Sequence, residues 1–75
     1  MNGTAPVKAT RWRDENGNVY HVDESSRNGR YVVIRTNPGG HRKGAKQFSA
    51  VGSSSYVQKV LDAQATASGW TEVTQ

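Results

Sequence analysis

Basic side chains in the middle of the chain are the residues with the clearest capacity for chemistry. No acidic residue occurs between Ser25 and Leu61. The same stretch contains seven cations, namely Arg27, Arg30, Arg35, Arg42, Lys43, Lys46 and Lys59. A segment whose charges all have one sign creates a local field that attracts polyanions. The charge pattern alone is equally compatible with a soluble basic surface that has no partner.

The segment 38–44 has the composition of an anion-binding loop. Its sequence is Pro-Gly-Gly-His-Arg-Lys-Gly. The glycines leave backbone amides accessible to an anion, and two cations lie next to them. It lacks the Gly-Lys-Ser/Thr pattern with which a P-loop opens a helix. We interpret it as the tip of a hairpin. Two roles are open for it: a grip on a phosphodiester backbone, or a flexible connection.

Catalytic and metal-binding residues are not expected. The chain contains two histidines, His21 and His41, and no cysteine. His21 and Asp23 are two residues apart in an extended segment, which places them on one strand face. Such a pair could orient a general base, but a surface ion pair is the simpler interpretation. Scattered carboxylates and two histidines do not provide matched metal ligands. We therefore predict a protein that is not an enzyme and has no cofactor.

Length and composition indicate a small domain with a minimal core. The chain has 75 residues, of which 33% are hydrophobic, and this fits one domain only. The absence of cysteine excludes disulfides and favours a reducing compartment. No apolar run approaches the length of a membrane span. We expect a cytoplasmic protein without a membrane partner, with a flexible arm at residues 1–9 and a single domain at residues 10–75.

Extended segments dominate the first two thirds of the chain. Alternation and β-branched residues predict strands at residues 10–14, 19–23, 30–36 and 46–51. The pair Asn16-Gly17 predicts a tight hairpin between the first two strands, with positive φ at both residues. Residues 37–45 are expected to be a connecting loop.

The last third of the chain has the pattern of one amphipathic helix. Val57, Val60, Leu61 and Ala65 fall on one stripe, which predicts a helix over residues 56–68. Serines before it can cap its first amides, and Gly69 is placed to end it. Residues 70–73 form either a short final strand or a tail folded onto the core.

These elements predict an α+β fold, in which a three- to four-stranded antiparallel meander sheet carries one C-terminal helix on one face. The other face is left to water or to a partner. Several strand cations could share that bare face, but the sequence does not fix the strand register.

Several short motifs follow one another between Gly29 and Trp70. They are Gly29-Arg30-Tyr31, Val32-Val33-Ile34-Arg35, Asn37-Pro38-Gly39-Gly40, Arg42-Lys43 and Lys46-Gln47-Phe48. In this order they resemble the amino-terminal, arm-type DNA-binding domain of phage-type tyrosine integrases. That family is similar in fold to the ethylene-response-type domain of plants, whose three-stranded sheet reads the major groove. The chain departs from the family at Gly52–Tyr56, where the family has Thr-x-x-Glu-Ala, and 75 residues cannot hold a recombinase domain.

The resemblance implies that Arg30, Arg35 and Lys46 contact DNA from strands, and that Arg42 and Lys43 bind phosphate. A module of this kind without a catalytic domain would be an accessory or regulatory DNA-binding protein of phage origin.

The patterns together predict a small nucleic-acid-binding module, with duplex DNA as the expected partner. Its basic sheet face and the loop at residues 37–46 would contact phosphates and, within reach, bases. The predicted contact residues are Arg11, Arg13, Arg30, Arg35, Arg42, Lys43 and Lys46. The alternative is a protein–protein interaction module, for example a phage-encoded modulator of a host protein, in which an outer strand adds to the partner's sheet.

Overall fold

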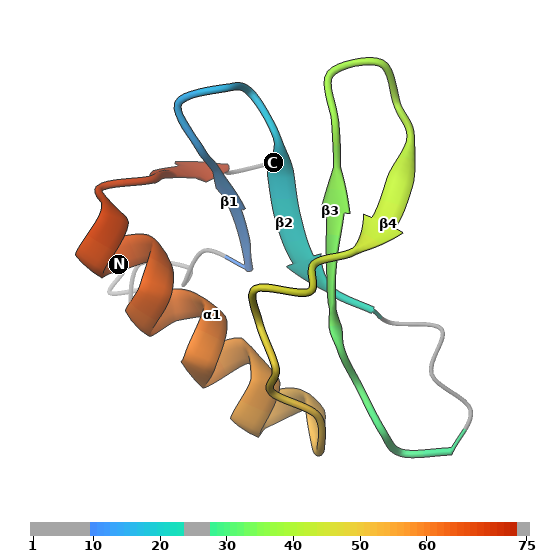
Figure 1. Cartoon of the computed structure of the whole chain (residues 1–75). Helices are drawn as coiled ribbons and strands as arrows, with labels where there is room; N and C mark the ends of the chain where they lie inside the picture. Colours follow the sequence, from blue (N-terminus) through green and yellow to red (C-terminus); the bar gives the residue numbers. More distant parts are fainter. Residues whose placement is uncertain (1–9, 24–27, 74–75) are drawn as a thin grey trace, which may run out of the picture.

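The computed structural model describes residues 10–23 and 28–73. These residues form one antiparallel sheet and one helix that lies on one side of it (Figure 1). The elements in chain order are β1 (Arg11–Arg13), β2 (Val19–Val22), β3 (Val33–Thr36), β4 (Arg42–Gly44), α1 (Ser54–Ser68) and β5 (Thr71–Val73). The predicted α+β class and meander are confirmed, and the sheet has a fifth strand. The predicted arm at residues 1–9 lies outside the described residues.

The sheet order is β4-β3-β2-β1-β5, with every neighbour antiparallel. After β4 the chain crosses one face of the sheet through α1, and β5 then pairs with β1 at the far edge (Figure 1). The helix is therefore not the last element, and residues 70–73 follow the first of their two predicted alternatives.

The core lies between α1 and the β1–β2 half of the sheet. Val57, Leu61 and Ala65 form the buried stripe of the helix, as predicted. They meet a cluster that consists of Trp12, Tyr20, Val22, Val33, Ala45 and Phe48. Each large apolar side chain that is fully buried contributes about 1.5–3 kcal/mol. This cluster therefore holds the helix against one half of the sheet.

Both ends of α1 show ordinary capping. The Ser53 hydroxyl accepts a hydrogen bond from the Tyr56 amide at 3.3 Å, so the helix begins at Ser54, two residues before the predicted start. Gly69 ends it with a φ of 71°. The reversal at Gly69 lets Trp70 stack on Tyr20, with 4.3 Å between ring centroids.

The predicted strand at residues 46–51 is wrong, because the fourth strand lies earlier in the predicted loop. Residues 42–44 pair with β3, where Thr36 faces Arg42 and Ile34 faces Gly44. A turn follows, closed by the Phe48 amide on the Ala45 carbonyl at 2.9 Å. Ala45, Phe48 and Ala50 are buried. Phe48 and Ala50 are thus buried without joining the sheet, while Val51 is exposed.

The third strand is shorter than predicted, since β3 begins at Val33. Before it, Tyr31 forms an isolated antiparallel bridge with Gly52. This bridge ties the approach to β3 to the segment that leads into α1. No helix among the described residues is long and apolar enough to cross a membrane.

Candidate nucleic-acid interface

The register divides the strand cations between the two faces of the sheet. One row runs Trp12, Tyr20, Arg35, Lys43, and the next runs Arg13, Val19, Thr36, Arg42. Neighbouring rows point to opposite faces. Trp12 and Tyr20 belong to the core beneath α1. The first row is therefore on the helix side, and the second row is on the bare face.

Three predicted contact residues share the bare face: Arg11, Arg13 and Arg42. Their cross-strand partners are uncharged: Arg11 faces Val73, Arg13 faces Val19 and Thr71, and Arg42 faces Thr36. Arg13 on β1 and Arg42 on β4 lie in one row. Three strand spacings separate them, or roughly 14 Å.

Arg42 is held across the bare face by His21. Its Nη2 lies 3.3 Å from Nε2 of His21, which is only 7% exposed. A guanidinium can only donate, so Nε2 must accept and the imidazole must be neutral in this contact. The contact gives His21 a structural role, whereas the sequence suggested a surface ion pair with Asp23 or an oriented general base.

Arg35 and Lys43 lie on the helix side, which corrects the prediction that all the strand cations form one basic face. The cause is strand alternation, since a shift of one residue moves a side chain to the opposite face. The helix does not cover them, because α1 packs chiefly against β2. Lys43 is exposed and Arg35 is half-buried.

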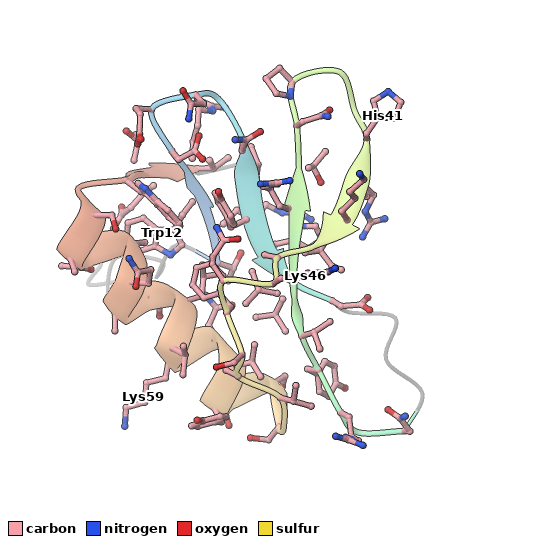
Figure 2. The ribbon with its side chains drawn as sticks, viewed as in Figure 1. Trp12, His41, Lys46 and Lys59 are labelled. Carbon is pink, nitrogen blue, oxygen red and sulfur yellow. The ribbon has the colours of Figure 1, made fainter. Side chains whose placement is uncertain are left out.

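Arg30 and Lys46 lie outside the strands, so the strand positions that the resemblance implies for them are wrong, while their contact with DNA stays a prediction. Arg30 precedes the Tyr31 bridge, and its amide bonds to the Asn28 side chain at 3.1 Å. Lys46 stands in the turn after β4, while Lys59 extends from α1 away from the sheet (Figure 2). We define the β3–β4 hairpin as residues 33–44. Lys46 is near this hairpin, whereas Lys59 is not.

The cations of this region have no acidic partner among the described residues. Within the described part of the chain, no carboxylate forms an ion pair with Arg11, Arg13, Arg35, Arg42, Lys43 or Lys46. The β3–β4 hairpin and the turn after it contain no acidic residue. Their positive field is therefore directed at solvent, where a polyanion can reach it.

The turn of the β3–β4 hairpin is closed by Asn37. Its side-chain Oδ1 accepts the His41 amide at 2.9 Å, and its carbonyl accepts the Gly40 amide at 2.9 Å. Gly40 has a φ of 88°, which favours glycine. The interpretation as a hairpin tip is confirmed for residues 38–41, whereas residues 42–44 of that segment form β4. Two of its amides are nevertheless used internally, so anion binding here must depend mainly on side chains.

The β1–β2 turn has the same geometry, with Asp14 in the place of Asn37. Asp14 Oδ1 accepts the Asn18 amide at 2.9 Å, and the Asp14 carbonyl accepts the Gly17 amide at 3.1 Å. Only Gly17 has positive φ, at 85°, so the predicted turn with positive φ at Asn16 is wrong. The structure is a longer turn with one left-handed glycine. A Cβ on Gly17 would lie 3.3 Å from Pro38, so the two turns are in contact.

Asp14 also anchors the buried phenol of Tyr20. The Tyr20 hydroxyl donates to Asp14 at 2.8 Å and accepts from Gln47 at 3.3 Å. Burial raises the pKa of Asp14, but hydrogen bonds from Asn18, Tyr20 and Asn16 outweigh it, so the pKa falls below its ordinary 3.8. Burial and the Asp14 carboxylate raise the pKa of Tyr20. This carboxylate is fully engaged in structure.

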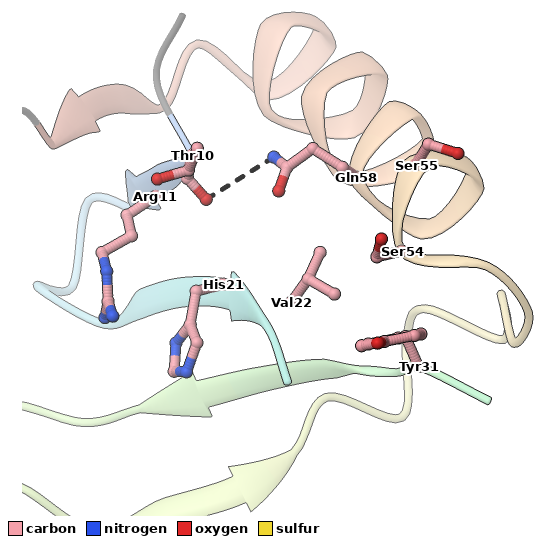
Figure 3. Close-up of a pocket in the computed structure, with 8 residues that line it drawn as sticks. All are labelled: Thr10, Arg11, His21, Val22, Tyr31, Ser54, Ser55 and Gln58. Atoms are coloured by element: carbon pink, nitrogen blue, oxygen red, sulfur yellow. Dashed lines mark hydrogen bonds between the residues drawn. The ribbon is translucent and has the colours of Figure 1, made fainter. Parts of the chain in front are cut away.

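Two hollows lie away from the β3–β4 hairpin tip. One of about 380 Å³ opens beside the start of α1 (Figure 3). It is lined by Thr10, Arg11, His21, Val22, Tyr31, Ser54, Ser55 and Gln58. The Gln58 amide bonds to the Thr10 carbonyl at 3.5 Å and to Asp62 at 2.9 Å. The other, of about 460 Å³, runs between α1 and residues 47–50. Among the described residues, no three His, Cys, Asp or Glu side chains gather as a metal site.

Sequence reasoning missed two residues that shape this region, Asp14 and Asn37. A signal for both was present, because each is an Asx residue with glycine three positions later. That spacing is typical of a type I turn, in which Asx accepts a later amide. His21 as the partner of Arg42 had no local signal, since the two meet only through strand pairing.

No family model, curated protein or solved structure matches the chain. The resemblance to integrase arm-type domains therefore stays a prediction, and the case for function depends on the geometry above.

Proposed function

We propose that this protein is a non-enzymatic nucleic-acid-binding module whose β3–β4 hairpin contacts the phosphates of duplex DNA. The observation that carries the proposal is the unpaired charge of this hairpin. Arg35, Arg42 and Lys43 occupy two neighbouring strands, and Lys46 follows in the next turn. No carboxylate of the described residues neutralises them.

The charge arrangement carries a cost that binding would remove. Arg35 and Lys43 are directly opposite in the register. Like charges in facing positions destabilise a sheet unless an opposite charge lies between them. A phosphate group bound at this pair supplies that charge and releases its own counterions, which is the main source of affinity for nucleic acid.

The resemblance to integrase arm-type domains supports the same class of partner, although it assigns the contacts differently. Its implied strand residues Arg30 and Lys46 are outside the sheet. The proposal therefore depends on Arg35, Arg42 and Lys43, with phosphate binding at Arg42 and Lys43 as the resemblance implies.

Strand addition to a partner protein is less well supported by the two sheet edges. Each outer strand, β4 and β5, has three residues. Arg42 and Lys43 are exposed on β4, and charged residues on a short edge strand oppose pairing with another sheet.

Fluorescence anisotropy with a labelled short duplex, measured at several salt concentrations, tests the proposal. If Arg35, Arg42 and Lys43 each contact one phosphate, the slope of log affinity against log salt is expected to be about −2.7. The double variant Arg42→Gln/Lys43→Gln should lower the steepness of that slope by about 2. Lys59→Gln, which removes one charge from the exposed face of α1, should leave the slope unchanged. Absence of binding at low salt, or identical slopes for all three proteins, would refute the proposal.

A further inference from the structure

The cations of the β3–β4 hairpin lie on both faces of the sheet edge. Arg42 and Lys43 are adjacent on the edge strand β4, so alternation directs them to opposite faces. Arg35 is opposite Lys43 and shares its face. Arg42 extends along the other face toward His21, with 3.3 Å between Nη2 and Nε2.

Both faces of this edge are open to a ligand. The helix lies at the other half of the sheet, beside β1 and β2, and leaves β4 uncovered (Figure 1). Arg42, Lys43 and Gly44 are all exposed. A flat polyanionic surface or a single strand that lies against the sheet can satisfy the cations of one face only. Two phosphate chains on opposite sides can satisfy both.

A duplex groove presents two such chains at a suitable separation. The major groove of B-DNA is about 12 Å wide and about 8.5 Å deep, and it admits a two-stranded ribbon. A sheet with side chains on both faces is roughly 10 Å thick, and its strands are about 4.8 Å apart. Both β4 and β3 therefore fit within the groove depth, whereas β1, about 14 Å from β4, stays outside. The minor groove, about 6 Å wide, is too narrow.

We infer that the sheet enters the major groove of duplex DNA with its β4 edge first. Arg42 then contacts one phosphate backbone, and Arg35 and Lys43 contact the other. This inference rests on the proposed nucleic-acid function and adds to it which groove of the duplex is bound and which edge of the sheet enters it. Docking through the bare face is the competing arrangement, in which Arg13 and Arg42 would contact DNA together and Lys43 would face away.

Three single variants separate these arrangements, because Arg13 and Arg42 share a row while Lys43 is on the other face. Arg13→Gln, Arg42→Gln and Lys43→Gln each remove one charge, and the labelled duplex and its isolated single strand are the probes. Edge-first binding predicts that Arg42→Gln and Lys43→Gln each reduce the steepness of the salt slope for the duplex by about 1, while Arg13→Gln has no effect. Arg42→Lys keeps the charge and should keep the slope, which separates the charge from the His21 contact.

The probes give a second readout. The duplex should bind more tightly than the single strand, and glucosyl groups on its cytosines, which fill the major groove, should abolish the difference. Equal losses for Arg13→Gln and Arg42→Gln with no loss for Lys43→Gln would overturn edge-first entry in favour of the bare face. Equal affinity for single strand and duplex would also overturn it. If no variant changes the slope, the proposed function itself fails.

Discussion

The β1–β2 and β3–β4 hairpins share one turn geometry and use their charges in opposite ways. In the β1–β2 turn, Asp14 accepts the amides of Asn16 and Asn18, and its other oxygen accepts the Tyr20 hydroxyl. In the β3–β4 turn, the neutral Asn37 accepts the corresponding amide, that of His41. The first hairpin uses its carboxylate to hold the core, and the second has no carboxylate to neutralise its cations.

The comparison distinguishes charges that are satisfied by hydrogen bonds inside the fold from charges that are left to bind a partner. Asp14 has four hydrogen-bond donors around it, so its charge is satisfied inside the fold. Arg35 lies between Tyr20 and Lys43 in the register, and no carboxylate of the described residues faces Arg35 or Lys43. Charges that a fold does not use internally remain available for a partner, and for cations that partner is a polyanion.

The largest expected effect comes from removal of the first hairpin's carboxylate. Asp14→Ala deletes an acceptor for the buried Tyr20 hydroxyl and for the turn amides, so the free energy of unfolding should fall by about 1–3 kcal/mol. Urea denaturation measures this change. Glu15→Ala, at an exposed neighbour in the same turn, should stay within about 0.5 kcal/mol of the unchanged protein. Equal stabilities for the two variants would show that Asp14 does not anchor the hairpin.

A smaller effect is expected when the second hairpin is made to resemble the first. Asn37→Asp keeps the oxygen that accepts the His41 amide, so the turn should form, but it places a negative charge among the cations. The steepness of the salt slope for duplex binding should fall by roughly 1, as it would for the loss of one phosphate contact. Gln64→Glu adds the same charge on α1 and serves as the control. If Asn37→Asp binds as tightly as the control, the hairpin is not the contact surface.

Much of the fold could be predicted from local patterns. The strands around Trp12, Tyr20 and Val33 were visible as alternation, and the helix around Leu61 was visible as a stripe. The position of β4 was missed because Arg42–Gly44 has no strand propensity. It pairs because the Asn37 turn places it opposite β3, so tertiary context decides its structure.

The candidate site was predicted in composition but not in arrangement. The cations were evident from the sequence, whereas their division between faces depends on register, and a one-residue shift exchanges the faces. The loop glycines were expected to free amides for an anion. The amides of Gly40 and His41 instead form hydrogen bonds within the turn. An anion would therefore be bound mainly by the cationic side chains.

The most direct test of the account is a map of amide chemical shifts of the isotope-labelled protein, recorded as a short duplex is added. The account predicts that the largest changes occur at Arg35, Arg42 and Lys43, with the amides of residues 14–18 and of the exposed face of α1 little affected. Changes centred on α1 or on the β1–β2 turn, with none in β3 and β4, would contradict it.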